Sequence, residues 1–169
     1  HSPFPDLEKI GYITSDESLE LKELPKSMAF LGGGPVALEM AYYFSNMGVE
    51  STIIQRSPHL LAQNDKDLAK VLEKSFRKNG IKVYTNTELK KFSKKGGEKI
   101  IEFNHGKKKV KLKVEEIFLG FGRVPNVDNI GLENLNMKLD EKKVPILNEH
   151  LQSSIKNIYV AGDSNGLLE

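Results

Sequence analysis

The sequence contains no cysteine among its 169 residues. This absence excludes a disulfide framework and thiol redox chemistry within these residues, and it suits a cytoplasmic protein. The sequence also lacks any apolar run near the roughly 18 residues of a membrane helix, and no secretory signal is visible. With 38% hydrophobic and 28% charged residues, the chain is expected to be a soluble, cytoplasmic globular domain with no membrane partner.

Positive and negative charges nearly balance, with a net charge of +2, but the lysines are concentrated in one segment. Between Lys90 and Lys113 there are ten lysines and only two glutamates. Such a surplus can attract nucleic acid or an acidic partner. The alternation in IIEF and KVKLKV, with glycine turns between the runs, favours an antiparallel hairpin with a solvated lysine face. We therefore expect no nucleic-acid partner.

The order of the predicted elements is that of an α/β fold. Short strands are predicted at 28–31, 49–54, 81–84 and 116–121, and helices at 36–47 and 65–79, the second with Asn64 as its N-cap. Alternating strands and helices imply a parallel sheet with right-handed crossovers. The lysine-rich hairpins would form an inserted antiparallel β layer.

The two flanks differ from this central region. Residues 1–26 are polar and contain three prolines, which predicts a connector that has one short helix near Ser15–Ser18 and buries little core. Beyond residue 124, loop signals separate short strand candidates at 137–139 and 144–147 from a final apolar strand at 158–161.

A glycine-rich loop lies between the first predicted strand and the first predicted helix. Its G-x-G-x-x-A pattern runs from Gly32 to Ala37 and is typical of dinucleotide binding in this context, although a triple glycine can also be only a flexible turn. The helix that follows would offer free amides and the positive end of its dipole to a pyrophosphate. The candidate cofactor-binding residues of this loop are Gly32, Gly33, Gly34, Pro35 and Val36.

The end of the second predicted strand lacks the acidic residue that would hold the ribose hydroxyls of NAD. Gln55 and Arg56 stand there instead, 23 and 24 residues after Gly32. An arginine can grip a phosphate with two donors, which favours NADP over NAD without excluding NAD or the use of both.

Together, the motifs resemble the central domain of the class I pyridine nucleotide-disulfide oxidoreductases, the family of dihydrolipoamide dehydrogenase, glutathione reductase and mercuric reductase. The resemblance covers nearly the whole chain. It rests on Thr14-Ser15-Asp16, Leu24-Pro25-Lys26-Ser27, GGGPVALE from Gly32 to Glu39, Gly122-Arg123-Val124-Pro125-Asn126, and Tyr159-Val160-Ala161-Gly162-Asp163.

The resemblance implies roles for five further residues, each with a structural alternative. Glu39 would act catalytically near the nicotinamide, paired with a lysine outside this chain, or be a solvated helix carboxylate. Gly120 and Gly122 would pass beside the dinucleotide, or only shape a strand end. Arg123 would lie near the flavin or a domain interface, or form a surface salt bridge. Asp163 would bind the ribityl chain of FAD, or cap a turn.

The resemblance also implies a domain organisation and an activity. Residues 1–26 would connect from a missing FAD domain, 27–124 would be a Rossmann-like NAD(P)-binding domain, and 125–169 would return towards the FAD domain. In the full-length enzyme, expected to be a homodimer like its relatives, this domain would position nicotinamide for hydride exchange with FAD, coupled to a disulfide centre absent here. The isolated chain would show no turnover. A free-standing dinucleotide-binding regulatory module and another Rossmann enzyme, such as a methyltransferase, are the alternatives.

Overall fold

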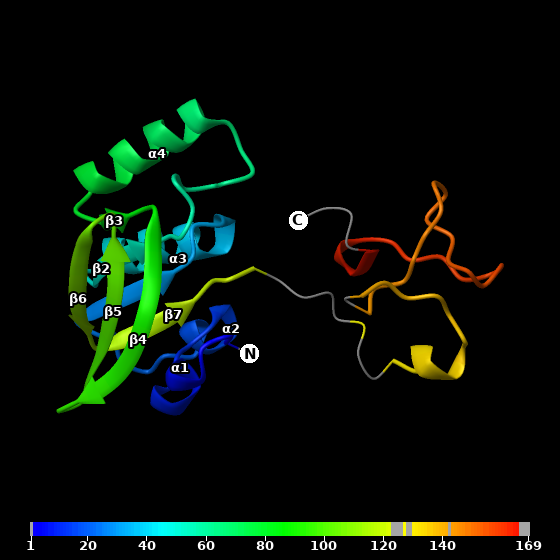
Figure 1. The fold of residues 1–169 in the computed structure, drawn as a ribbon, viewed down its shortest axis with the longest axis horizontal. Helices are drawn as coiled ribbons and strands as arrows, with labels where there is room; N and C mark the ends of the chain where they lie inside the picture. Colours follow the sequence, from blue (N-terminus) through cyan, green and yellow to red (C-terminus); the bar gives the residue numbers. More distant parts are fainter. Residues whose placement is uncertain (1, 123–126, 128–129, 142, 166–169) are drawn as a thin grey trace. The chain divides into compact units, whose positions relative to one another are not determined.

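The structure is a computed structural model that describes residues 2–122, 127, 130–141 and 143–165. It divides into two compact units, His1–Gly122 and Arg123–Glu169, which are described separately. The helices and strands of the first unit are α1 (Pro5–Ile10), α2 (Ser15–Leu19), β1 (Ser27–Leu31), α3 (Pro35–Asn46), β2 (Glu50–Ile54), α4 (Lys66–Lys78), β3 (Lys82–Tyr84), β4 (Thr87–Lys95), β5 (Glu98–His105), β6 (Lys108–Val114) and β7 (Glu116–Leu119) (Figure 1).

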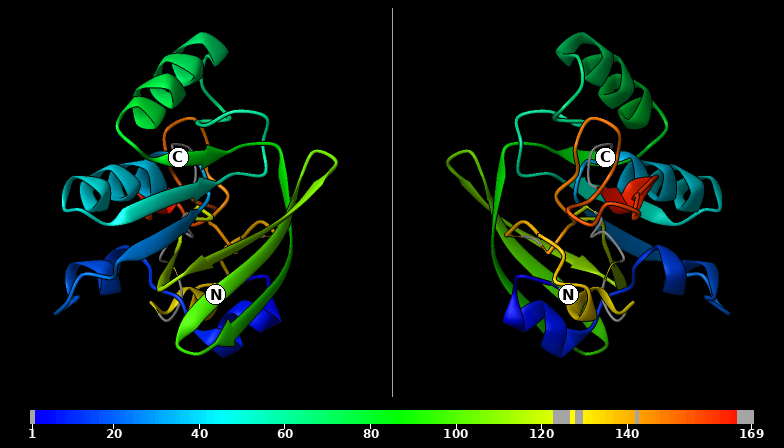
Figure 2. Two further views of the ribbon diagram at one scale, coloured as in Figure 1. Left: turned by 90° about the vertical axis from the view of Figure 1, so that its left-hand side faces the viewer. Right: turned by 90° about the vertical axis from the view of Figure 1, so that its right-hand side faces the viewer.

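The centre of the first unit is a parallel sheet in the order β3-β2-β1-β7, which confirms the predicted α/β fold class. Side chains alternate along each strand, so β1 supplies a core on both faces of the sheet. Met28 and Phe30 pack with α3 and α4, whereas Ala29 and Leu31 pack with the antiparallel layer. Figure 2 shows α3 and that layer on opposite sides of the parallel sheet.

The antiparallel layer is a three-stranded sheet in the order β4-β5-β6. Its inward-facing residues, among them Phe92, Ile101 and Phe103, are buried against the parallel sheet. The strands are joined by tight turns at Gly96–Gly97 and Gly106, where the glycines have positive φ angles. The prediction of hairpins with an apolar inner face and a lysine-rich outer face is confirmed.

The predicted helices are confirmed, with small shifts at their ends. α3 begins at Pro35, and α4 begins at Lys66 with Asp65 as its N-cap rather than Asn64. The carboxylate of Asp65 accepts hydrogen bonds from the backbone N–H of Asp67 and Leu68, which satisfies two amides of the first turn.

The prediction that residues 1–26 bury little core is wrong. This segment forms two helices rather than one, and Leu7 of α1 is fully buried against the antiparallel sheet. Ile13 lies beside Phe118 of β7. The N–H of Ile13 donates to the carbonyl of Ile117 at 2.9 Å, and the N–H of Leu119 donates to the carbonyl of Ile13 at 2.8 Å. The segment therefore packs as part of the first unit.

The strands predicted in the second unit are reduced to isolated bridges. Leu139 bridges Pro145, and Tyr159 bridges Gln152. The final segment, 158–161, does not extend the parallel sheet, because its backbone bonds are made locally. Ser153 donates to the carbonyl of Ile158 at 2.9 Å, and the N–H of Val160 donates to the carbonyl of Leu151 at 3.0 Å.

Candidate functional site

The carboxyl ends of the four parallel strands lie in register at one edge of the sheet. Leu31 of β1 is the pairing partner of Ile54 in β2 and of Leu119 in β7. The residues that follow these strand ends continue the hydrogen bonding: Gly32 donates to the carbonyl of Ile54 at 3.0 Å, and Gly120 donates to that of Leu31 at 2.8 Å. The chain turns to opposite sides of β1 here, so this edge is a topological switch point, where open α/β sheets bind ligands.

The three loop glycines differ in what surrounds them. Gly32 has a φ of +121°, and a Cβ atom there would lie 2.2 Å from the carbonyl oxygen of Gly120. At Gly33 a Cβ would lie 2.9 Å from the Gln55 side chain. At Gly34 a Cβ would meet nothing within 4 Å. Packing and backbone conformation therefore require glycine at position 32, whereas a side chain at position 33 would only displace Gln55, and Gly34 leaves its backbone open to an approaching ligand.

The helix that follows begins in the open space beside Gly34. Gly34 is the N-cap of α3, with no side chain to cap it, and Pro35 occupies the first turn. Val36 is half-buried, and Ala37 is almost fully buried beneath Gly120, where a Cβ added to Gly120 would lie 2.7 Å from that of Ala37. The small residue at 37 thus lets α3 approach the sheet, and its amino end faces the switch point with uncapped amides.

The loop between β2 and α4 folds against the glycine loop, a feature that sequence analysis missed. Leu61 donates its N–H to the carbonyl of Gly33 at 2.8 Å, although this requires a φ of +48° at a leucine. Leu60 is fully buried and donates to Glu73 of α4 at 3.2 Å. The only sequence signal was the Leu60-Leu61 pair within a polar loop.

Gln55 and Arg56 lie at the end of β2, next to the glycine loop. The Gln55 side chain packs on Gly33, and its Oε1 accepts a hydrogen bond from the N–H of Arg56 at 3.0 Å. Gln55 is thus held against the loop. Arg56 is exposed, and no ion pair to its guanidinium is found among the residues that the structure describes.

The remaining predicted residues fall into four groups. Gly120 packs directly against the glycine loop, and Gly122 follows it with a φ of +107°. Glu39 is exposed on α3, one turn after the loop. Asp163 is exposed at the start of a 3-10 helix (Asp163–Asn165) in the second unit. Arg123 lies outside the described residues.

Two features are absent from the part of the chain that the structure describes. No group of three or more His, Cys, Asp or Glu side chains there is arranged to hold a metal ion. None of its helices combines the length and the apolar composition of a membrane span.

Comparisons with known proteins place these features in context. Residues 4–169 match the family described as pyridine nucleotide-disulphide oxidoreductase. A dihydrolipoyl dehydrogenase of Mycobacterium leprae is 31% identical over 157 residues, which are 93% of this chain and 34% of that protein. A mercuric reductase of Staphylococcus aureus is 31% identical over 94% of this chain and 29% of its own length.

The fold comparison gives the same result. The structure of the HOCl-induced flavoprotein disulfide reductase RclA from Escherichia coli matches with a TM-score of 0.89 and 26% identity. The match covers 100% of this chain and 38% of RclA. The chain therefore spans about a third of the length of each of these relatives.

Proposed function

Because the chain belongs to the pyridine nucleotide-disulphide oxidoreductase family, we propose that its glycine loop binds the pyrophosphate of a nicotinamide dinucleotide. The observation that carries the proposal is the contrast among the glycines: Gly32 and Gly33 are closed by packing, and Gly34 opens onto free space at the uncapped start of α3. Backbone amides and the helix dipole at that point suit a phosphate group.

The residues around the loop fit the rest of such a ligand. Gly32 to Val36 would hold the pyrophosphate, with Gly120 and Gly122 beside it. Gln55 and Arg56 would face the ribose of the adenosine half, where the exposed guanidinium of Arg56 suits the extra phosphate of NADP. We therefore favour NADP over NAD as the preferred cofactor.

The share of this chain in the reaction would be binding and orientation. The bound nicotinamide supplies hydride exchange with a flavin in the full-length enzyme. Glu39, one turn along α3 from the pyrophosphate loop, would lie on the nicotinamide side and orient the ring. For FAD, the chain offers Asp163 as a candidate contact, and Arg123 as one that lies outside the described residues; we assign the remaining flavin contacts, and dimerisation, to other parts of the whole protein.

The cofactor preference is tested by titrating the chain with NADPH and with NADH. Arg56→Ala removes a charge-assisted contact of about 1.5–3 kcal/mol, so we expect NADPH affinity to fall roughly 10- to 100-fold and NADH affinity to change by less than about twofold. The measurement is isothermal titration calorimetry or quenching of tyrosine fluorescence.

Arg77→Ala is the matched control, because Arg77 is an exposed arginine in the last turn of α4. It should leave both affinities unchanged. Equal losses for NADPH and NADH in Arg56→Ala, or NADH binding as tightly as NADPH in the unaltered chain, would show that Arg56 does not select the cofactor.

A further inference from the structure

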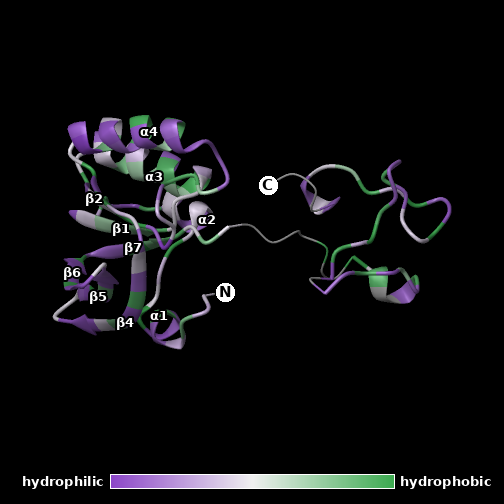
Figure 3. Ribbon diagram, turned by 45° about the horizontal axis from the view of Figure 1, so that its top comes forward, coloured by the Kyte–Doolittle hydropathy of each residue, from purple (hydrophilic) through white to green (hydrophobic). Residues whose placement is uncertain are grey.

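The antiparallel sheet has a strong charge surplus that the dinucleotide site does not use. Its residues 87–114 include ten lysines and three glutamates, whereas the rest of the chain has fifteen basic and twenty acidic residues. Figure 3 shows hydrophilic residues spread over β4, β5 and β6. The charge of the molecule is therefore polarised, with its positive part on this sheet.

The lysines of β6 lie on the outer face of the sheet because the inner face is largely apolar; Lys99 of β5 is the exception among the ten lysines, since it is buried against Glu116 of β7. Val110 and Leu112 of β6 pack inward, so Lys109, Lys111 and Lys113 alternate with them and face outward, where all three are exposed. Shallow depressions run over β5 between these lysines and those of β4. Their lining residues include Lys90, Lys95, Glu98, Ile100, Glu102 and Asn104.

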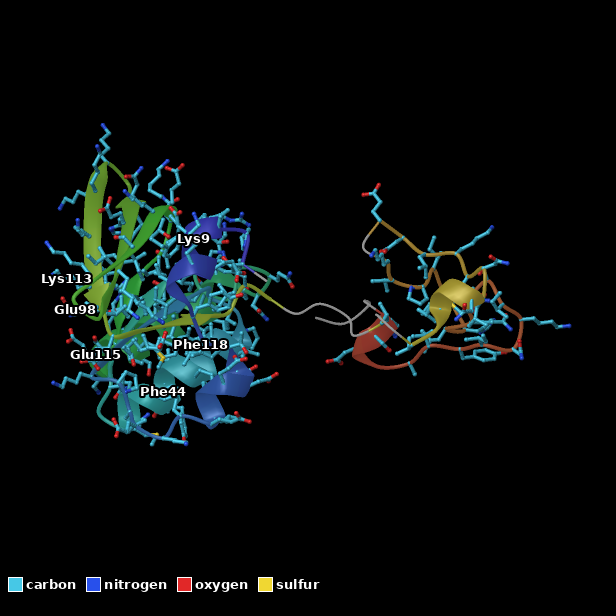
Figure 4. All side chains as sticks on the ribbon, turned by 90° about the horizontal axis from the view of Figure 1, so that it is seen from below. Lys9, Phe44, Glu98, Lys113, Glu115 and Phe118 are labelled. Carbon is cyan, nitrogen blue, oxygen red and sulfur yellow. The ribbon has the colours of Figure 1, made fainter. Side chains whose placement is uncertain are left out.

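The glutamates of the sheet are already engaged. Glu102 pairs with Lys111 at 3.0 Å, and Glu98 pairs with Lys113 at 3.2 Å. Figure 4 shows Glu98 and Lys113 near each other at the margin of the sheet. A hydrogen bond from Lys90, and a weaker one from Asn104, lower the pKa of Glu88, so it stays ionised. Within the described residues, six exposed lysines of this sheet have no acidic partner: Lys91, Lys94, Lys95, Lys107, Lys108 and Lys109.

Both edge strands of the sheet, β4 and β6, lack a further strand partner in the described part of the chain, but β4 is packed against α1. β6 pairs only with β5, so its second edge presents unpaired backbone groups (Figure 1). Alternate residues on a strand are about 6.6–6.8 Å apart, which is the spacing of Lys109, Lys111 and Lys113. An extended peptide with acidic residues at alternate positions has the same spacing, and side chains directly opposite on neighbouring strands interact.

We propose that β6, with its outward-facing lysines Lys109, Lys111 and Lys113, is a docking site for an extended acidic segment of another protein. The segment adds as a strand to the free edge of β6, with its carboxylates opposite Lys109, which has no acidic partner within the sheet, and opposite Lys111 and Lys113, whose solvent-exposed pairs with Glu102 and Glu98 leave room for a second carboxylate. Backbone hydrogen bonds supply affinity, and the lysines supply selectivity. Lysines on an edge strand repel basic strands and deter apolar ones, so the edge selects for acidic sequences.

The residue types on this face favour an acidic polypeptide over a nucleic acid or a second copy of this chain. Residues 87–114 contain no arginine, and Phe103, the aromatic residue that lines one depression, is buried and offers no platform for a base. Glu98 and Glu102 also lie within the depressions. A second copy pairing through its own β6 would set like charges opposite one another.

The test uses the 169-residue chain and a fluorescein-labelled peptide of about ten residues in which glutamate and threonine alternate. A peptide of the same composition, with its glutamates in one block, is the control for spacing. Binding is followed by fluorescence anisotropy at about 50 mM and about 200 mM salt. Amide shifts in the isotope-labelled chain locate the bound peptide.

The variant is Lys109→Thr/Lys111→Thr/Lys113→Thr, in which threonine preserves strand propensity. Its matched control is Lys70→Gln/Lys74→Gln/Lys78→Gln on α4, which removes the same charge elsewhere. We expect the β6 variant to bind the alternating peptide at least about tenfold more weakly and the α4 variant to bind it within about twofold. The amide shifts should concentrate in Lys108–Val114.

Four results would overturn the proposal: no binding of the alternating peptide tighter than about 1 mM at low salt, equal binding of the block peptide, equal loss in the two variants, or tighter binding of a single-stranded oligothymidylate. Concentration-dependent self-association that the peptide does not displace would assign the edge to a second copy instead. The peptide contacts none of the dinucleotide residues, so these outcomes are independent of the NADPH titration.

Discussion

At the residue scale, the glycine loop is held by contacts that leave no room for a side chain at two of its three positions. Gly32 combines a positive φ with a carbonyl oxygen at 2.2 Å from where a Cβ would stand. At Gly33 an added Cβ would meet the side chain of Gln55, which can move, rather than backbone atoms. Gly32 is therefore the position at which substitution disturbs the loop most.

Gly32→Ala should destabilise the chain by about 2–4 kcal/mol, because it adds backbone strain and forces β1 and the Gly120 strand end apart. The measurement is urea unfolding followed by circular dichroism. Gly34→Ala is the control, since its Cβ meets open space. It should cost less than about 1 kcal/mol of stability, as a weaker N-cap, yet reduce binding of both dinucleotides.

A stability loss in Gly34→Ala equal to that in Gly32→Ala would contradict this account of the loop. Unchanged dinucleotide binding in Gly34→Ala would instead contradict the assignment of the pyrophosphate to it.

At the element scale, the two sheets are joined by a nearly buried ion pair. Lys99 of β5 pairs with Glu116 of β7, and their side chains are 7% and 21% exposed. Glu116 also accepts a hydrogen bond from the N–H of Ile117 at 2.8 Å. The pair thus fixes the antiparallel layer at the amino end of the strand that leads to Gly120.

Lys99→Met should lower the free energy of unfolding by about 2–4 kcal/mol, because it leaves the Glu116 carboxylate buried without a counter-charge. The double change Lys99→Met/Glu116→Leu should recover most of that loss, since packed apolar residues replace buried pairs at little cost. Urea unfolding of both variants measures the difference.

Lys113→Met is the control within the same sheet. Its pair with Glu98 is half exposed on both sides, so its loss should cost less than about 1 kcal/mol. A double variant as unstable as Lys99→Met alone would show that the ion pair, rather than its packing, holds the layers together.

At the scale of the whole molecule, the described residues of both hydrophobic clusters come from the first unit. In sequence order, the last residue of the cluster packed with α3 and α4 is Phe118, and the last residue of the cluster packed with the antiparallel sheet is Leu119. The second unit buries Val127, Met137 and Val144 outside these clusters. The first unit has the core and the size of an independent folding domain.

A fragment that ends at Gly122 should therefore unfold cooperatively, with a free energy within about 1 kcal/mol of the corresponding transition in the full chain. Urea titration followed by circular dichroism checks this. A gradual transition, or one that moves when residues 123–169 are added in trans, would show that the first unit depends on the second for its stability.

The sequence by itself determined most of the helices and strands of the first unit. Hydrophobic periodicity located the four parallel strands, the helices α3 and α4, and the lysine-faced hairpins. The periodicity of each element is visible in the sequence because it is set by residues only a few positions apart. Gly32 to Ala37 predicted a dinucleotide loop for the same reason. Local pattern failed for the segment 158–161, which is as apolar as a core strand but bonds to residues 151–153 instead.

The tertiary structure alone decided which distant residues meet. That Gly120 lies over Gly32, that Gln55 closes on Gly33, and that Leu7 is buried beneath the antiparallel sheet all depend on strand order and register. Those are set by the summed packing of both faces of the sheet, which no single stretch of sequence encodes. The physical reason is that periodicity fixes which face of an element is apolar, whereas its partner is chosen only when all the elements bury those faces together.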